Sequence, residues 1–134
     1  MMLTAQQIIA KVEGLKHLAE LDPRDFAEEG GYAHLLAREF GGTLKPTQLR
    51  KVFHALKRID LSLKGRPADA TLDRAEVNRL IPELAYALGR QLIPQKFYTL
   101  MKACLGHQRT QTVGDFRRAM ELLTAVLAYQ KLNE

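Results

Sequence analysis

The chain has 134 residues, 46% of them hydrophobic and 26% charged, which is the size of one domain whose core forms without disulfides or a metal ion. It contains no apolar run of about 18 residues and no secretory signal pattern, so we expect a cytoplasmic protein with no membrane partner. The net charge is +5, but residues 1–43 carry −3 and residues 44–134 carry +8. This basic character favours nucleic acid as a partner, with an acidic protein surface as the alternative.

Apolar residues recur at helical spacing along the whole chain, and no segment alternates as a strand does. The sequence therefore predicts an all-α fold, a compact bundle of about five to six helices in a single domain covering 1–134. We expect acidic helices in 1–43 and a basic core in 44–134. The helices predicted in the acidic region are 5–20, a short one after Pro23, and 32–40.

The segment 47–60 separates into two opposite faces when it is wound as a helix. One side is apolar and consists of Leu49, Val52, Phe53, Leu56 and Ile59. The other side, within an arc of about 120°, consists of Arg50, Lys51, His54, Lys57 and Arg58. Because like charges on one helix face repel one another, the pattern indicates a surface that binds a polyanion or an acidic partner.

After a loop at 61–70, three more helices are predicted, at 72–91, 94–105 and 112–132. The first of them carries four polar side chains within about 60° of one another, namely Arg79, Glu83, Tyr86 and Arg90. This stripe fits a phosphate-binding face with an aromatic ring available for a base or ribose. The alternative is a solvated face in which Arg79 pairs with Glu83 and Tyr86 is half-buried.

No pattern for catalysis or metal binding is present. The four histidines have unrelated spacings, and no glycine-rich phosphate loop, nucleophile elbow or Ser/His/Asp arrangement can be drawn. The single cysteine, Cys104, lies on the apolar face of its helix and is predicted to be a buried thiol. We therefore expect no catalytic residues, no metal ion and no cofactor.

Three short blocks in the C-terminal two-thirds carry a resemblance. They are QLRK at 48–51, LAYA with a following GR at 84–90, and AYQK at 128–131. In this order they resemble the small subunit of type III-A, or Csm-type, CRISPR effector complexes. The resemblance implies a non-catalytic helical protein whose copies stack into a minor filament. That filament lies beside the backbone and large subunits and faces the target RNA.

The predicted nucleic-acid-binding set combines the motif positions with other cations of the same region. Three members of this set match motif positions of the family, and the resemblance implies that they contact nucleic acid: Arg50, Lys51 and Arg90. The four further members of the set are Lys57, Arg58, Arg79 and Lys96. At Glu83 the chain departs from the family, in which a basic residue is common. The contact there is either missing or replaced by a pair with Arg79.

Together these features predict a protein that binds target RNA, or other single-stranded nucleic acid, with little sequence preference. The alternative is a helical adaptor whose basic face binds an acidic protein partner. A hydrolase acting on nucleic acid is a third class, but the sequence lacks a carboxylate cluster that would hold its metal.

From Ala119 onward the last helix is apolar nearly all round, so it is either central in the bundle or shared with a partner. It would permit a homodimer of the isolated chain.

Overall fold

The computed structural model describes residues 2–133 and confirms the all-α prediction. That range contains no strand. It has seven α-helices, where about five to six were predicted, and the short helix expected after Pro23 is one of them, α2. The elements are α1 (Ala5–Glu13), the 3-10 helix η1 (Leu18–Glu20), α2 (Pro23–Phe26), α3 (Tyr32–Phe40), the 3-10 helix η2 (Gly41–Thr43), α4 (Pro46–Ser62), α5 (Ala75–Gly89), α6 (Gln95–Leu105) and α7 (Val113–Leu132).

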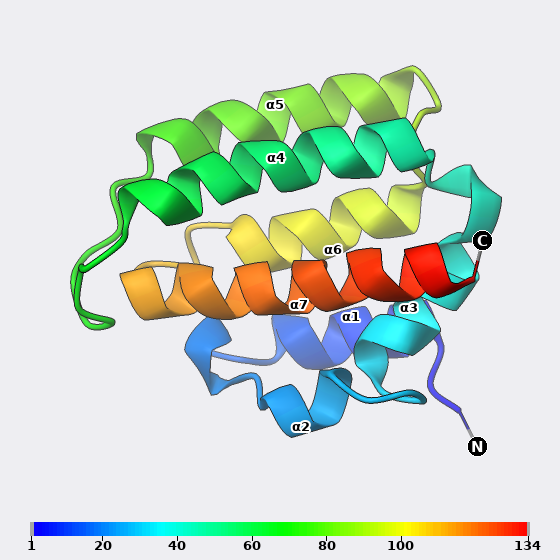
Figure 1. Cartoon of the computed structure of the whole chain (residues 1–134), viewed down its shortest axis with the longest axis horizontal. Helices are drawn as coiled ribbons and strands as arrows, with labels where there is room; N and C mark the ends of the chain where they lie inside the picture. The colour runs from blue at the N-terminus through cyan, green and yellow to red at the C-terminus, as the bar shows by residue number, and fades with distance from the viewer. Residues whose placement is uncertain (1, 134) are drawn as a thin grey trace.

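The helices are arranged around α7, which crosses the middle of the molecule (Figure 1). In this view α4 and α5 lie side by side above α7, and α1, α2 and α3 lie below it. The contacts of α7 reach η1, α2, α3, α4 and α6, and its buried side chains include Phe116, Leu122 and Val126. The nearly all-apolar last helix is therefore the central helix of the bundle, one of the two positions that its sequence allowed.

The first helix is shorter than predicted. Its capping box forms, but the helix ends at Glu13 and not near residue 20, with Gly14 as its C-cap. The carbonyl of Glu13 accepts a hydrogen bond from Arg109 Nη2, 2.6 Å away. After Gly14 the chain turns into η1, so Leu18 is buried and Ala19 is exposed. The local signal for this end is Gly14, and the prediction passed over it because it followed the apolar periodicity.

The helix predicted to begin at residue 72 begins at Ala75 instead. The residues before it are held by the connection between α6 and α7. The N–H group of Leu72 donates to the carbonyl of Gln111 at 2.9 Å, and the Arg74 guanidinium donates to two backbone carbonyls near the end of α6, each at 2.7 Å. These long-range hydrogen bonds replace the helical pairing that local sequence favours.

Two arginines in the first half of α7 fasten distant segments to the central helix. Arg117 Nη2 donates to the carbonyls of Leu63 and Arg66, at 3.1 and 2.8 Å. Arg118 Nη1 donates to the carbonyl of Ala19 at 3.0 Å. Both guanidinium groups therefore serve the fold, which separates them from the exposed cations of α4.

A buried carboxylate joins the start of α7 to η1. Asp115 is 1% exposed, and its oxygens accept hydrogen bonds from the N–H groups of Ala19, Gln111 and Thr112 at 2.9 to 3.1 Å. Burial acts to raise the pKa of Asp115, but the three N–H donors outweigh it and hold the pKa below its ordinary value. The folded structure thus stabilises the charged form of Asp115.

Candidate nucleic-acid interface

The two faces predicted for the basic helix are present on α4. Its buried side chains are Leu49, Val52, Leu56 and Ile59, whereas Phe53 is half-buried. Its exposed cations are Arg50, Lys51, Lys57 and Arg58. None of these four side chains forms a hydrogen bond or an ion pair with another described residue. Their charges are therefore available to an external anion.

The position of α4 follows from its start and from its neighbours. Pro46 occupies the first turn, where a missing N–H group costs no helical hydrogen bond. The buried Leu44 precedes it, and the N–H group of Lys45 donates to the carbonyl of Leu92 at 3.4 Å. Because α4 also packs on α5 and α7, only its cationic side is left facing outward.

A hollow of about 340 Å³ separates α4 from α5 on the outer surface. It is lined from α4 by Ala55, Arg58 and Ile59 and from α5 by Glu76, Arg79, Leu80 and Glu83. The structure therefore brings together Arg58 and Arg79, two members of the predicted set that lie 21 positions apart in the sequence. The two glutamates in the same hollow limit how much anion it would hold.

The polar stripe on α5 does not match the alternative of a solvated face with an Arg79–Glu83 pair and a half-buried Tyr86. Among the described residues no ion pair joins Arg79 to Glu83. Tyr86 is 66% exposed and not half-buried. Arg90 lies one turn further along, where its Nη1 donates to the Tyr86 hydroxyl at 3.3 Å and its Cζ is 5.8 Å from the ring centroid. An aromatic ring and a guanidinium thus stand together on the surface of α5.

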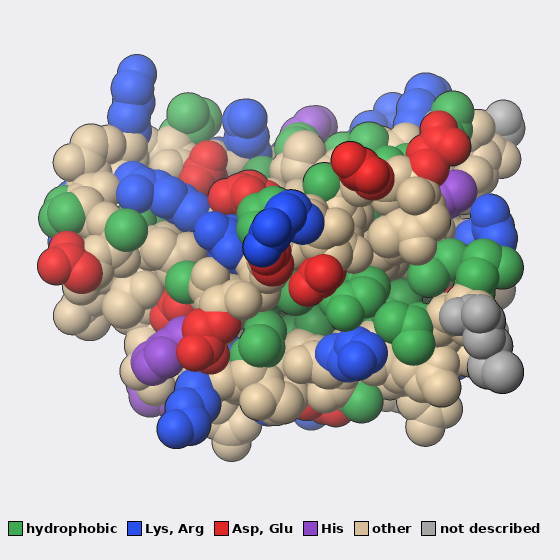
Figure 2. Space-filling view, turned by 90° about the horizontal axis from the view of Figure 1, so that it is seen from below, with side chains coloured by type: hydrophobic (Ala, Val, Ile, Leu, Met, Phe, Trp, Pro, Cys, Tyr) green, Lys and Arg blue, Asp and Glu red, His purple; other side chains and the backbone are tan. Residues whose placement is uncertain are grey.

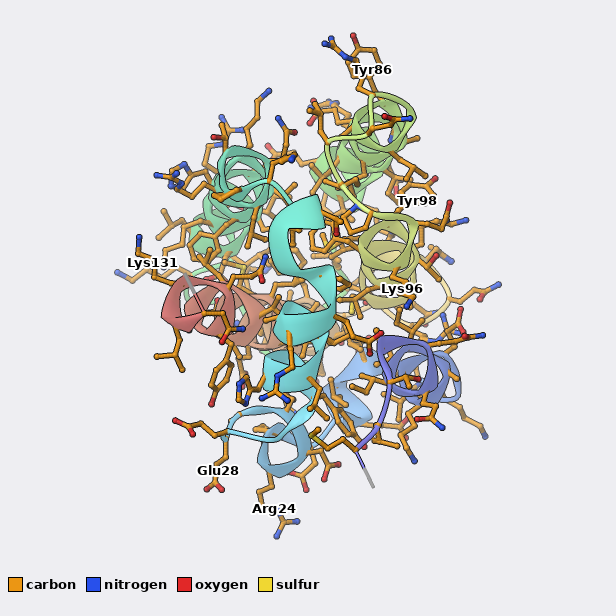
Figure 3. The ribbon with its side chains drawn as sticks, turned by 90° about the vertical axis from the view of Figure 1, so that its right-hand side faces the viewer. Arg24, Glu28, Tyr86, Lys96, Tyr98 and Lys131 are labelled. Atoms are coloured by element: carbon orange, nitrogen blue, oxygen red, sulfur yellow. The ribbon has the colours of Figure 1, made fainter. Side chains whose placement is uncertain are left out.

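Lys96 stands apart from the other six predicted residues. It lies on α6, and its Nζ is 3.1 Å from Glu39 Oε1 of α3. Figure 3 shows Lys96 on the side of α6 that faces away from α4, whereas Tyr86 projects from the top of α5. The structure therefore gathers Arg50, Lys51, Lys57, Arg58, Arg79 and Arg90 on two neighbouring helices and leaves Lys96 in an ion pair elsewhere.

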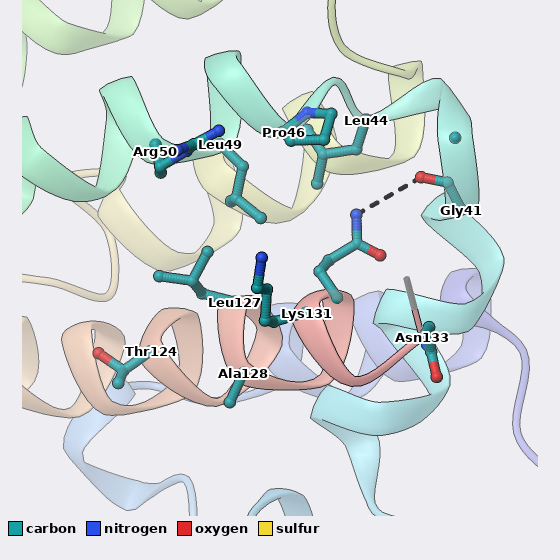
Figure 4. Close-up of a pocket in the computed structure, with 12 residues that line it drawn as sticks. Gly41, Leu44, Pro46, Leu49, Arg50, Thr124, Leu127, Ala128, Lys131 and Asn133 are labelled. Atoms are coloured by element: carbon teal, nitrogen blue, oxygen red, sulfur yellow. Dashed lines mark hydrogen bonds between the residues drawn. The ribbon is translucent and has the colours of Figure 1, made fainter.

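Sequence reasoning did not predict an apolar groove on the other side of α4. It has a volume of about 710 Å³ and lies between the start of α4 and the end of α7 (Figure 4). Leu44, Leu49 and Leu127 line it, and Arg50 stands at its edge. The signal for it was the apolar character of the last helix, of which Ala128 remains exposed. The cations of α4 therefore extend from this groove at Arg50 to the polar hollow at Arg58.

The opposite face of the molecule has mixed charges. Figure 2 shows the surface below α1, α2 and α3, where acidic and basic side chains alternate over short distances. Arg24 lies here with its Nη2 2.8 Å from Asp22 Oδ2. A polyanion would meet carboxylates on this face, so the α4 side is the better candidate for nucleic acid.

Other chemistry has little support in the described portion of the chain. Residues 2–133 hold no group of three or more His, Cys, Asp or Glu side chains placed to bind a metal ion. Burial raises the pKa of the Cys104 thiol to about 12, so this thiol stays protonated and unreactive at neutral pH. No described helix has the length and the apolar character needed to cross a membrane.

Comparison with known proteins identifies the family. The family model Csm2 Type III-A matches residues 24–134, a range that contains α3 to α7 and every member of the predicted site. A search of curated proteins and a search of solved structures found no match. The matched range extends further toward the N-terminus than the sequence blocks did, the first of which begins at Gln48. The chain belongs to the Csm2 type III-A family, the small subunits of type III-A CRISPR effector complexes, and so associates with other Csm subunits.

Proposed function

We propose that this small subunit binds the target RNA, or other single-stranded nucleic acid, through α4 and the adjoining face of α5, and catalyses no reaction itself. The observation that carries the proposal is the set of four exposed cations on α4 without partners among the described residues. Like charges held together in this way lower the stability of the free protein slightly. A bound phosphate chain would remove that repulsion.

The same cations explain why no sequence preference is expected. Lys and Arg side chains on an exposed helix reach phosphates, which carry no sequence information. Binding of this kind releases condensed counterions. Affinity should therefore fall steeply with salt and depend little on the order of the bases.

Within the effector complex, we propose that copies of this chain form the minor filament with α4 turned toward the target strand. The mixed-charge face below α1 to α3 and the apolar groove beside α7 are then left for contacts with protein. The complex would act in the cytoplasm, where its RNA target is found. We assign the acidic segment 1–43 to packing and subunit contacts, and the basic segment 44–134 to nucleic acid.

Fluorescence anisotropy with two unrelated single-stranded RNAs of equal length tests the proposal. We expect affinities for the two strands that agree within about threefold, because phosphates and not base edges are contacted. A strong preference for one strand, or an affinity unchanged between low and high salt, would contradict it. The absence of any RNA binding, combined with binding to an acidic protein partner, would favour the adaptor function instead.

A further inference from the structure

One large aromatic side chain stands open beside the proposed interface. We propose that Tyr86 is a stacking platform for a base of the bound single strand, and that Arg90 holds the ring and adds charge beside it. This inference rests on the proposed function, and it adds a contact to the base itself. It concerns a residue outside the predicted set of cations.

Tyr86 is exposed although the other tyrosines of the chain are not. It is 66% exposed, whereas Tyr32, Tyr98 and Tyr129 are each half-buried. Tyr129 shows what a structural tyrosine does here, because its ring stacks on His34 at 4.8 Å between centroids and its hydroxyl donates to the carbonyl of Ala27 at 2.7 Å. The ring of Tyr86 does not pack in the core in this way, so its surface is available to a ligand.

Arg90 makes the ring of Tyr86 a better-defined platform. Its Nη1 donates to the tyrosine hydroxyl at 3.3 Å, and its Cζ lies 5.8 Å from the ring centroid. A side chain restrained in this way loses less conformational entropy when a base stacks on it. The guanidinium also places a positive charge next to the position of the base, where the neighbouring phosphate of the strand would lie.

The placement of Tyr86 fits the path that the cations of α4 define. α4 and α5 lie side by side and run in opposite directions (Figure 1), and Arg58 meets Arg79 across the hollow between them. Tyr86 lies seven residues after Arg79 on α5, and Lys51 lies seven residues before Arg58 on α4. Each step is about 10 Å along its helix in the same direction. A strand that passes from Arg58 to Lys51 therefore passes Tyr86 as well.

The ligand is identified by this combination of charge and ring. Cations alone would suit any polyanion, whereas an exposed ring between cations suits a chain of phosphates that carries unpaired bases. Every base offers a π-face, so stacking adds affinity without sequence preference. Double-stranded nucleic acid keeps its bases stacked internally and would not reach the ring. The structure thus favours single strands.

The variants Tyr86→Ala and Tyr86→Phe of this chain test the inference by anisotropy with a single-stranded RNA. We expect Tyr86→Ala to weaken binding at least about fivefold, whereas Tyr86→Phe, which keeps the ring, should stay within about twofold of the parent. The salt dependence should be the same in all three proteins, because no phosphate contact is removed. Circular dichroism checks that the exposed substitution leaves the fold unchanged.

A strand of the same length with abasic sites separates stacking from phosphate binding. It keeps the phosphates and lacks the bases, so the advantage of the parent over Tyr86→Ala should disappear on it. If the advantage persists on the abasic strand, Tyr86 does not act by stacking and the inference is overturned.

Because the chain has no tryptophan, Tyr86→Trp introduces a single tryptophan at the proposed platform, and its fluorescence can be followed. Its emission should be quenched when RNA binds. The matched control is Tyr98→Trp on α6, since Tyr98 also lies one turn before a cation, with Lys102 Nζ 5.4 Å from its ring centroid, and points away from α4 (Figure 3). Its emission should not change, and equal quenching at both positions would contradict the inference.

The outcomes distinguish this inference from the function on which it rests. If the parent binds RNA and Tyr86→Ala binds it equally well, the stacking platform is wrong and the cationic interface stands. If the parent binds no single-stranded RNA at all, the proposed function fails and the inference fails with it.

Discussion

Two carboxylates of the N-terminal third, Glu20 and Glu39, have partners within the fold, whereas the charged side chains on α4 form no hydrogen bond or ion pair with another described residue. Glu20 Oε1 accepts hydrogen bonds from the N–H groups of Lys16 and His17 at 3.1 and 3.0 Å. The backbone donor at His17 is the main cause that holds the pKa of Glu20 below its ordinary value. Glu39 pairs with Lys96 and also accepts from the N–H group of Ala5. These two carboxylates therefore differ from the cations of α4 in having partners inside the protein.

This difference separates two kinds of mutational effect. Removing a charge from α4 breaks no internal hydrogen bond or ion pair, so it should change nucleic-acid binding and leave the free energy of unfolding nearly unchanged. Removing a partnered charge at the N-terminal junction should do the reverse. Each of the following variants would sharpen this contrast or break it.

The largest effect is expected for the triple variant Arg50→Glu, Lys51→Glu, Arg58→Glu. Three attractions to phosphate become repulsions, and RNA affinity at low salt should fall by roughly a hundredfold or more. The matched control reverses three exposed cations of the N-terminal third, Lys11, Lys16 and Arg38, and gives the same net charge. Anisotropy should show a much smaller loss for the control, and equal losses would mean that net charge alone drives binding.

An intermediate effect, on stability, is expected for Asp115→Asn. The amide cannot accept from all three N–H donors of the buried carboxylate, so the free energy of unfolding should fall by about 2 kcal/mol, while RNA affinity stays constant. The folded-state pKa of Asp115 is lowered, so its contribution to stability is present above the ordinary carboxyl pKa and is lost as pH falls through the folded pKa. Urea unfolding at neutral and acid pH should show the variant losing less stability on acidification than the parent.

The smallest effect is expected for Lys96→Ala. This residue belongs to the predicted nucleic-acid-binding set, but its Nζ is paired with Glu39 on a side of the molecule away from α4. An ion pair with this exposure contributes less than about 1 kcal/mol to stability. RNA affinity should change by less than about twofold. A loss as large as that for Arg58→Ala would show that the interface extends over α6.

The fold could be predicted from sequence where local signals decide it, and the error at the start of α5 has a long-range cause. The segment 32–40 ends at glycines and was predicted at its observed bounds, and the face of α4 followed from periodicity alone. The residues before α5 are held by Gln111, a residue far along the chain. Periodicity within a window contains no information about such partners.

The candidate site shows the same limit. Charge and spacing identified the cations of α4, but the meeting of Arg58 with Arg79 depends on how two helices pack. The ion pair of Lys96 with Glu39 joins residues 57 positions apart, and no local pattern would reveal it. The exposure of Tyr86 was one of two options at the sequence level, and packing alone decided between them.

The salt dependence of RNA binding tests the central claim most directly. We would compare the parent with the double variant Lys51→Ala, Arg58→Ala and with the charge-matched control Lys11→Ala, Lys16→Ala, whose two side chains also form no hydrogen bond or ion pair with another described residue. If the α4 cations neutralise phosphates, the slope of log affinity against log salt should become shallower by about 1.4 in the α4 variant and stay unchanged in the control. Identical slopes in all three proteins would contradict the assignment of α4 as the nucleic-acid interface.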